Sequence, residues 1–139
     1  MSRIIKTESN LRDRNRLSRW IVFAIRTLMM QPEASDESKD LVAFIIICLQ
    51  EIDHSIEASV VAWEKRGYWV KADRFRMQWQ WAGKSATELQ SSLEEEDWGK
   101  IVIQMVQLGQ RFSTVKLPNR MKESPPWENA YQRLNMGKN

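Results

Sequence analysis

Apolar residues recur at alternating intervals of four and three between residues 68 and 93. The positions that carry this spacing are Tyr68, Ala72, Phe75, Trp79, Ala82, Ala86, Leu89 and Leu93. Intervals of this kind place every one of these side chains on one face of an α-helix, along the seam where the helix packs at a shallow angle on its neighbours. The spacing therefore predicts a long helix over residues 68–93.

The composition favours helix in the rest of the chain as well. Only four of the 139 residues are proline and five are glycine, and these are the two residues that disfavour helix most strongly. We therefore predict an all-α protein. A chain of this length is expected to form a single domain over residues 1–139. Residues 1–8 are expected to be a flexible arm, and residues 116–139 a tail that contains a short helix.

Two further helices are predicted before Gly67. The first has about twenty residues and stops near Gln31, because the proline that follows disfavours helical backbone in the residue before it. Ser35 or Asp36 can cap the second helix. Gly67 is then expected to separate this helix from the one over residues 68–93. In the alternative, the two helices continue through Gly67 as one rod, which leaves a three-helix protein that dimerises.

A fourth helix is predicted after a chain reversal at residues 94–97. Either Asp97 caps it, or Ser91 and Glu94 form a capping box there. A short final helix follows, in which Ser124 is the expected cap and Pro125 the first residue. The residues on its apolar face are Trp127, Tyr131 and Leu134.

Short links between successive helices favour antiparallel neighbours. The predicted architecture is therefore an up-down-up-down four-helix bundle with the short C-terminal helix docked on it. The side chains that we expect to be buried together are Ile21, Ile25, Ile45, Cys48, Ile52, Ile56, Phe75, Trp79, Leu89, Ile101, Met105 and Leu108.

The longest apolar run, from Leu41 to Leu49, is far shorter than the ~20 residues that span a bilayer. No apolar segment follows the N-terminal cations at once, so no secretory signal is predicted. Cys48 lies inside the apolar run and is expected to act as a small buried hydrophobe in a reducing compartment. These features predict a soluble, cytoplasmic protein.

Charged residues occur in blocks of alternating sign, and an antiparallel bundle would gather each sign at one end. The cations expected at one end include Arg14, Arg66, Arg74 and Lys116, and the acids expected at the other are Glu37, Asp40, Glu95 and Asp97. The helix macrodipole favours acids at helix starts and cations at helix ends. It does not explain the basic residues that follow Leu11 and Val70, where two helices are expected to begin. Cations at those positions indicate an anionic partner.

Catalytic and metal-binding patterns are not found in the sequence. Glu51 and His54 have the spacing of half a carboxylate-bridged di-iron site, but His54 is the only histidine, so the second half is missing. Cys48 and His54 are six residues apart and would point in different directions on a helix. We therefore expect no enzymatic activity, no metal and no cofactor.

Two tryptophans, Trp69 and Trp81, lie off the apolar seam of the helix over residues 68–93. They either widen the buried face or stand exposed beside Arg74, Arg76 and Lys84. Burial is the favoured interpretation, because exposed rings flanked by cations would require a partner to explain them.

The leading hypothesis is a non-enzymatic helical-bundle interaction protein whose basic, aromatic-rich end contacts a protein or other anionic partner. The residues predicted to make this contact are Arg12, Arg16, Lys65, Arg66, Trp69, Lys71, Arg74 and Arg76. The alternative is a nucleic-acid-binding regulator that contacts phosphates through the same end, although a net charge of only +3 argues against indiscriminate coating of nucleic acid. Association into a homodimer is compatible with both hypotheses.

Overall fold

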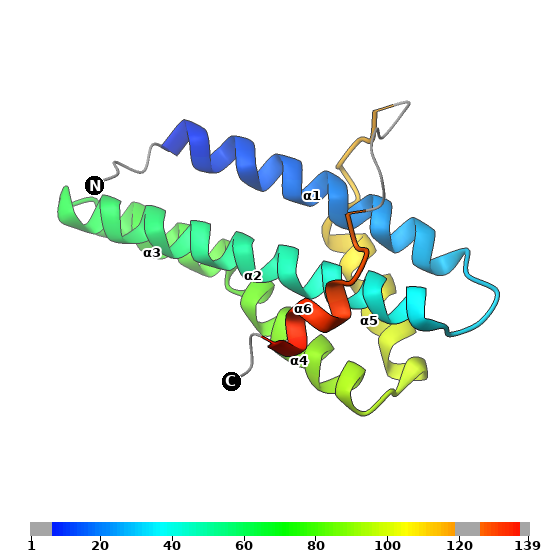
Figure 1. Ribbon diagram of the computed structural model, residues 1–139. Helices are drawn as coiled ribbons and strands as arrows, with labels where there is room; N and C mark the ends of the chain where they lie inside the picture. The colour runs from blue at the N-terminus through cyan, green and yellow to red at the C-terminus, as the bar shows by residue number, and fades with distance from the viewer. Residues whose placement is uncertain (1–6, 119–125, 137–139) are drawn as a thin grey trace.

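The computed structural model describes residues 7–118 and 126–136, which form helices and the turns between them (Figure 1). The helices are α1 (Thr7–Met29), α2 (Asp36–Lys65), α3 (Trp69–Trp79), α4 (Trp81–Glu94), α5 (Trp98–Arg111) and α6 (Ala130–Met136). No strand occurs in these ranges, so the predicted all-α class is confirmed for the residues described. None of the helices found there has both the length and the apolar character needed to cross a bilayer.

Helix α2 lies at the centre of the fold, and α1, α3, α4 and α6 all pack against it. The sequence explains this position, because every residue from Leu41 to Ile46 is apolar and buried, on all sides of the helix. A helix that is apolar all round has to be covered all round. Helix α5 packs on α4 and α1 rather than directly on α2.

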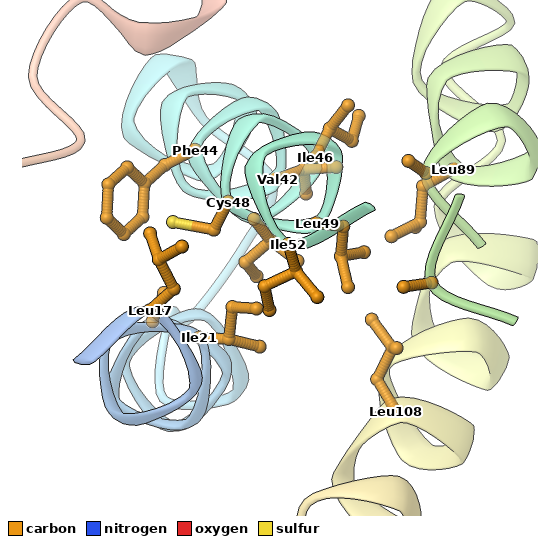
Figure 2. Close-up of a cluster of buried hydrophobic side chains, with 14 of the residues drawn as sticks. Leu17, Ile21, Val42, Phe44, Ile46, Cys48, Leu49, Ile52, Leu89 and Leu108 are labelled. Atoms are coloured by element: carbon orange, nitrogen blue, oxygen red, sulfur yellow. The ribbon is translucent and has the colours of Figure 1, made fainter. Parts of the chain in front are cut away.

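The buried side chains of four helices meet in one core. Figure 2 shows Ile21 of α1 and Leu49 and Ile52 of α2 facing Leu89 of α4 and Leu108 of α5. The predicted core is confirmed for ten residues, which are Ile21, Ile25, Ile45, Cys48, Ile52, Ile56, Leu89, Ile101, Met105 and Leu108.

Phe75 and Trp79 were also predicted to be core residues, and they are only partly buried. The reason is that α3 packs on one side of the C-terminal half of α2, and that no second helix of the described residues lies outside it (Figure 1). Within α3, only Ala72 is fully buried.

Helix α2 ends in a tight turn at Gly67, whose φ of +84° is the left-handed conformation that favours glycine. The N–H of Gly67 donates to the carbonyl of Glu64 at 3.0 Å, and the N–H of Tyr68 donates to the carbonyl of Trp63 at 2.9 Å. This pair of bonds is the Schellman motif that terminates many helices. The chain therefore reverses at Gly67, and the alternative of one continuous rod is wrong.

Replacement of Gly67 by alanine is expected to lower the free energy of unfolding by about 1 kcal/mol, because alanine is strained in the left-handed conformation. A Cβ atom would meet nothing within 4 Å there, so only the backbone contributes. Gly109 of α5 is the matched control, since a Cβ atom there also meets nothing within 4 Å. Its replacement by alanine is expected to raise stability by up to about 1 kcal/mol. Chemical denaturation that moved both variants in the same direction would contradict this account of the turn.

The helix predicted over residues 68–93 is divided at Gln80 into α3 and α4. Trp79 and Trp81 stack on each other across the break, with ring centroids 5.6 Å apart. Residues two apart do not face each other on a continuous helix. The two rings can therefore stack only because the helix is interrupted between them. The apolar seam itself is confirmed in α4, where Ala82, Ala86, Leu89 and Leu93 are buried.

The expected caps are found at two helix starts. Ser35 caps α2 through the backbone N–H of Ser38 at 3.2 Å, and Asp97 caps α5 through the N–H of Lys100 at 3.1 Å. The cap of α2 is therefore Ser35 rather than Asp36, and the cap of α5 is Asp97 rather than a capping box of Ser91 and Glu94. With α3 and α4 taken together as the third helix, the arrangement is compatible with the predicted up-down-up-down order.

Helix α6 docks on the N-terminal half of α2 (Figure 1). The carboxylate of Asp40 accepts hydrogen bonds from the backbone N–H groups of Asn129 at 3.2 Å and Tyr131 at 2.9 Å. Asp40 thus caps α6 from another helix. The predicted cap Ser124 and first residue Pro125 lie outside the described residues, and α6 begins later, at Ala130.

Trp127 precedes α6 and fills the space between α1 and α2. Its ring lies 5.8 Å from that of Phe23 and 6.2 Å from that of Phe44. Its indole N–H donates to the carboxylate of Glu37 at 3.3 Å. Trp127 and Leu134 are buried and Tyr131 is partly buried, so the predicted apolar face of the final segment is the one that docks.

Candidate partner-binding surface

The N-terminal half of α1, the C-terminal end of α2 and α3 lie side by side at one end of the molecule (Figure 1). Arg14 links them, because its guanidinium donates to the hydroxyl of Ser55 at 2.9 Å and lies 5.1 Å above the ring of Phe75. We call this region the basic end. Its exposed cations are Arg12, Arg16, Lys65, Arg66, Lys71 and Arg74. Arg14 and Arg74 are thus at the same end, as the charge pattern predicted.

Two arginines at the basic end have structural roles. Arg14 is itself buried, and the loss of water around its guanidinium lowers its pKa. Arg76 lies among the carboxylates of Glu57, Glu64 and Asp73, at 3.7, 3.3 and 3.2 Å. Arg76 was a predicted contact residue, but its charge is already matched within the fold.

Lys116 was expected at the basic end and lies elsewhere. It shares a groove with Asn15, Ser18 and Arg19, beside the middle of α1. The loop after α5 passes that part of α1 (Figure 1), and none of the exposed cations of the basic end lines the groove that Lys116 lines.

The outer side of α3 exposes apolar side chains among cations. Trp69 is 61% exposed, Val70 66% and Met77 69%. Lys71 and Arg74 are exposed on the same short helix. These five residues form what we call the α3 surface. The favoured interpretation that Trp69 is buried is therefore wrong.

Trp81 differs from Trp69 and is partly buried. Its ring packs edge-on against Phe112 at 5.5 Å and stacks with Trp79. The guanidinium of Arg111 lies 4.9 Å from the centre of the same ring. The expectation that Trp81 packs within the fold is thus met in part.

A hollow of about 560 Å³ adjoins the α3 surface, with Trp63 and Phe75 among its lining residues. The ammonium of Lys71 lies 4.6 Å from the centre of the Trp63 ring. Val70 and Arg74 also line the hollow, and no carboxylate does. The hollow thus combines aromatic walls with a cationic rim. Val70 was not among the predicted contact residues, although its position opposite Ala72 on the helix indicates an exposed side chain.

Several acids at the opposite end have partners within the fold. Lys39 of α2 and Glu96, in the turn after α4, form an ion pair at 3.5 Å, which shows that the start of α2 and the turn between α4 and α5 lie together. Asp97 caps α5, and Asp40 holds α6. These acids therefore have structural explanations.

Cys48 and His54, the residues considered for catalysis, differ in their exposure to solvent. Cys48 is buried, whereas His54 is exposed. Burial, with a smaller effect of Glu51, raises the pKa of the Cys48 thiol to about 12. The thiol therefore stays protonated at neutral pH, and a protonated thiol is a poor nucleophile. Among the described residues, no three His, Cys, Asp or Glu side chains are grouped so that they could hold a metal ion.

Cys48 is expected to resist alkylation by iodoacetamide in the folded protein. Both burial and the raised pKa limit thiolate formation, so the rate at pH 8 should be at least about 100-fold lower than in guanidinium. Mass spectrometry of timed samples measures the two rates. Rapid alkylation of the folded chain would show that Cys48 is accessible and would contradict its placement in the core.

No protein family, curated protein or solved structure matches this chain.

Proposed function

We propose that this chain is a non-enzymatic interaction protein that contacts an acidic protein partner through the α3 surface and the basic end around it. The observation that carries the proposal is the exposure of Trp69, Val70 and Met77 on one short helix. Single apolar residues on a surface need no explanation, but a cluster rimmed by charged residues marks interaction sites in other proteins.

The kind of residue on this surface supports a protein contact. Tryptophan and arginine are enriched among the residues that contribute most to binding between proteins. Trp69 supplies a large ring that is not yet buried, and Arg74 supplies a planar cation that can bind a carboxylate with two hydrogen bonds. The hollow lined by Trp63 and Phe75 is large enough to take a side chain from a partner.

The electrostatics of α3 favour an acidic group on the partner. The first turn of α3 has no acidic residue, and its N-cap Tyr68 makes no side-chain hydrogen bond to the helix. The positive end of the helix dipole is therefore uncompensated, and Lys71 adds to it. A carboxylate from a partner would be stabilised beside these groups.

Affinity capture from the native host tests the proposal. The wild-type chain is compared with the double variant Trp69→Ala/Arg74→Ala, and with the matched control Ile103→Ala/Lys100→Ala. The control also removes one exposed apolar residue and one exposed cation, from α5. We expect a protein that the wild type and the control retain and that the α3 variant loses. Equal retention by all three would refute the proposal.

The response to salt separates this function from the alternative. A protein contact anchored by Trp69 should persist at salt concentrations well above physiological, whereas phosphate contacts weaken steeply as salt is added. Single-stranded and duplex oligonucleotides are tested at low salt in parallel. An oligonucleotide shift that Trp69→Ala/Arg74→Ala abolishes, with no retained protein, would replace the proposal with nucleic-acid binding.

A further inference from the structure

A second concave site lies on a different part of the molecule, where the middle of α1 meets the end of α3, the start of α4 and the loop after α5. This groove has a volume of about 480 Å³. Its lining includes Arg19 from α1, Trp79 and Trp81 from either side of the break at Gln80, and Arg111 and Lys116 from the end of α5 and the loop beyond it. Nothing argued so far for the α3 surface uses these residues.

All the charged residues that line the groove are basic. Arg19, Arg111 and Lys116 line it, and no acidic residue does. Within the described part of the chain, none of these three cations has an ion pair with a carboxylate. Cations that share a concave site repel one another unless an anion is present. The groove therefore favours an anion with more than one charge.

One of the cations is held in place before any ligand arrives. The guanidinium of Arg111 lies 4.9 Å from the centre of the Trp81 ring, a distance at which cation and ring attract. Trp81 is itself fixed by its stack on Trp79 and by its edge contact with Phe112. A cation that is already ordered loses less entropy on binding, and this raises affinity.

The remaining lining favours more than a bare phosphate. Asn15 and Gln78 supply amide groups, which can donate and accept hydrogen bonds. Trp79 supplies aromatic surface beside them. The volume falls in the range of about 300–1,000 Å³ that is usual for sites of small organic ligands. The site thus has separate groups for a polyanionic part, a polar part and a planar apolar part.

We infer that this groove binds a nucleotide, with its phosphates at Arg19, Arg111 and Lys116 and its ring system near Trp79. The source of the nucleotide is either a free nucleoside diphosphate or a nucleotide of a single strand with its two flanking phosphates, since both present a planar base beside more than one negative charge. No covalent step is involved, and the site is one for binding alone.

Calorimetric titration of the full chain at low salt tests the inference with ADP, adenosine, pyrophosphate and a short single-stranded oligonucleotide. ADP is expected to bind at least about tenfold more tightly than adenosine or pyrophosphate, because each of these lacks one part that the site recognises. Oligonucleotide binding without ADP binding would support the site and identify a strand as the source. Failure of both to bind at millimolar concentration would overturn the inference, as would equal affinity for ADP and adenosine or for ADP and pyrophosphate.

Variants establish where the nucleotide binds. Arg19→Gln and Lys116→Gln are each expected to weaken binding about tenfold, the effect of losing one charged hydrogen bond. Lys100→Gln removes an exposed cation of α5 that does not line the groove, and it should leave binding unchanged. Circular dichroism confirms that each variant is folded. Undiminished binding by both groove variants would overturn the inference, whatever the affinity of the wild type.

Discussion

Replacement of Leu49 by alanine is expected to lower the free energy of unfolding by about 2–5 kcal/mol, the usual range for such a deletion in a well-packed core. Leu49 is 0% exposed and points from α2 into the space between α1, α4 and α5 (Figure 2). Its removal leaves a cavity that no single neighbouring helix can close. Denaturant unfolding monitored by tryptophan fluorescence measures the loss.

Val61→Ala provides the control for this substitution. Val61 lies on the same helix but is 45% exposed, so its truncation should change stability by no more than about 0.5 kcal/mol. If Leu49→Ala cost as little as Val61→Ala, the central position of α2 would be wrong. The denaturant dependence should be the same for both variants, because neither is expected to alter the extent of unfolding.

Asp40→Ala is expected to cost about 1–3 kcal/mol and to release α6 from α2. The carboxylate of Asp40 accepts two backbone hydrogen bonds, from Asn129 and Tyr131. The loss of a helix cap costs about 1 kcal/mol, and hydrogen bonds to a charged group are at the strong end of the range. Release of α6 also exposes Trp127, so its indole should become accessible to a soluble quencher.

Glu51→Ala is the matched control for Asp40→Ala. Glu51 is an exposed acid of the same helix and has no hydrogen bond or ion pair among the described residues. Its replacement should change neither stability nor quenching of Trp127 by a measurable amount. Limited proteolysis provides a second readout. Only the Asp40→Ala variant should be cleaved more readily than the wild type in the segment that follows Trp127. If the two variants were cut alike, Asp40 would not be the residue that holds α6.

The features that could be predicted from the sequence depend on neighbours along the chain. Ser35 and Asp97 were found because a cap contacts a residue three positions further on. The buried residues of α4 were found because their spacing matches one helix face. Gly67 as a chain break follows from the conformation that glycine allows.

The features that could not be predicted depend on contacts between distant segments. Asp40 and Tyr131 are 91 residues apart, and nothing local shows that one caps the helix of the other. The break at Gln80 has no proline or glycine at it. It accompanies the stacking of Trp79 on Trp81, and the helices on both sides of it, α3 and α4, pack on α2.

The candidate surface was predicted in part for the same reason. The exposed cations Arg12, Lys71 and Arg74 could be identified from the charge pattern alone. Periodicity could not decide whether Trp69 is covered, because that depends on whether another helix lies outside α3. In the described structure none does, which leaves Trp69 exposed. The charge pattern could not show that Arg76 lies among three carboxylates, because these come from two helices.

Site-specific photocrosslinking in the native host tests most directly whether the α3 surface contacts a partner. A photoreactive phenylalanine analogue is placed at Val70 of α3 or at Ile103 of α5, which are 66% and 60% exposed. The two positions offer similar access to solvent on different parts of the molecule. We predict a protein adduct from position 70 that is absent from position 103 and is lost when Arg74→Ala is added. Adducts from position 103 alone, or the same adducts from both positions, would contradict the proposed function.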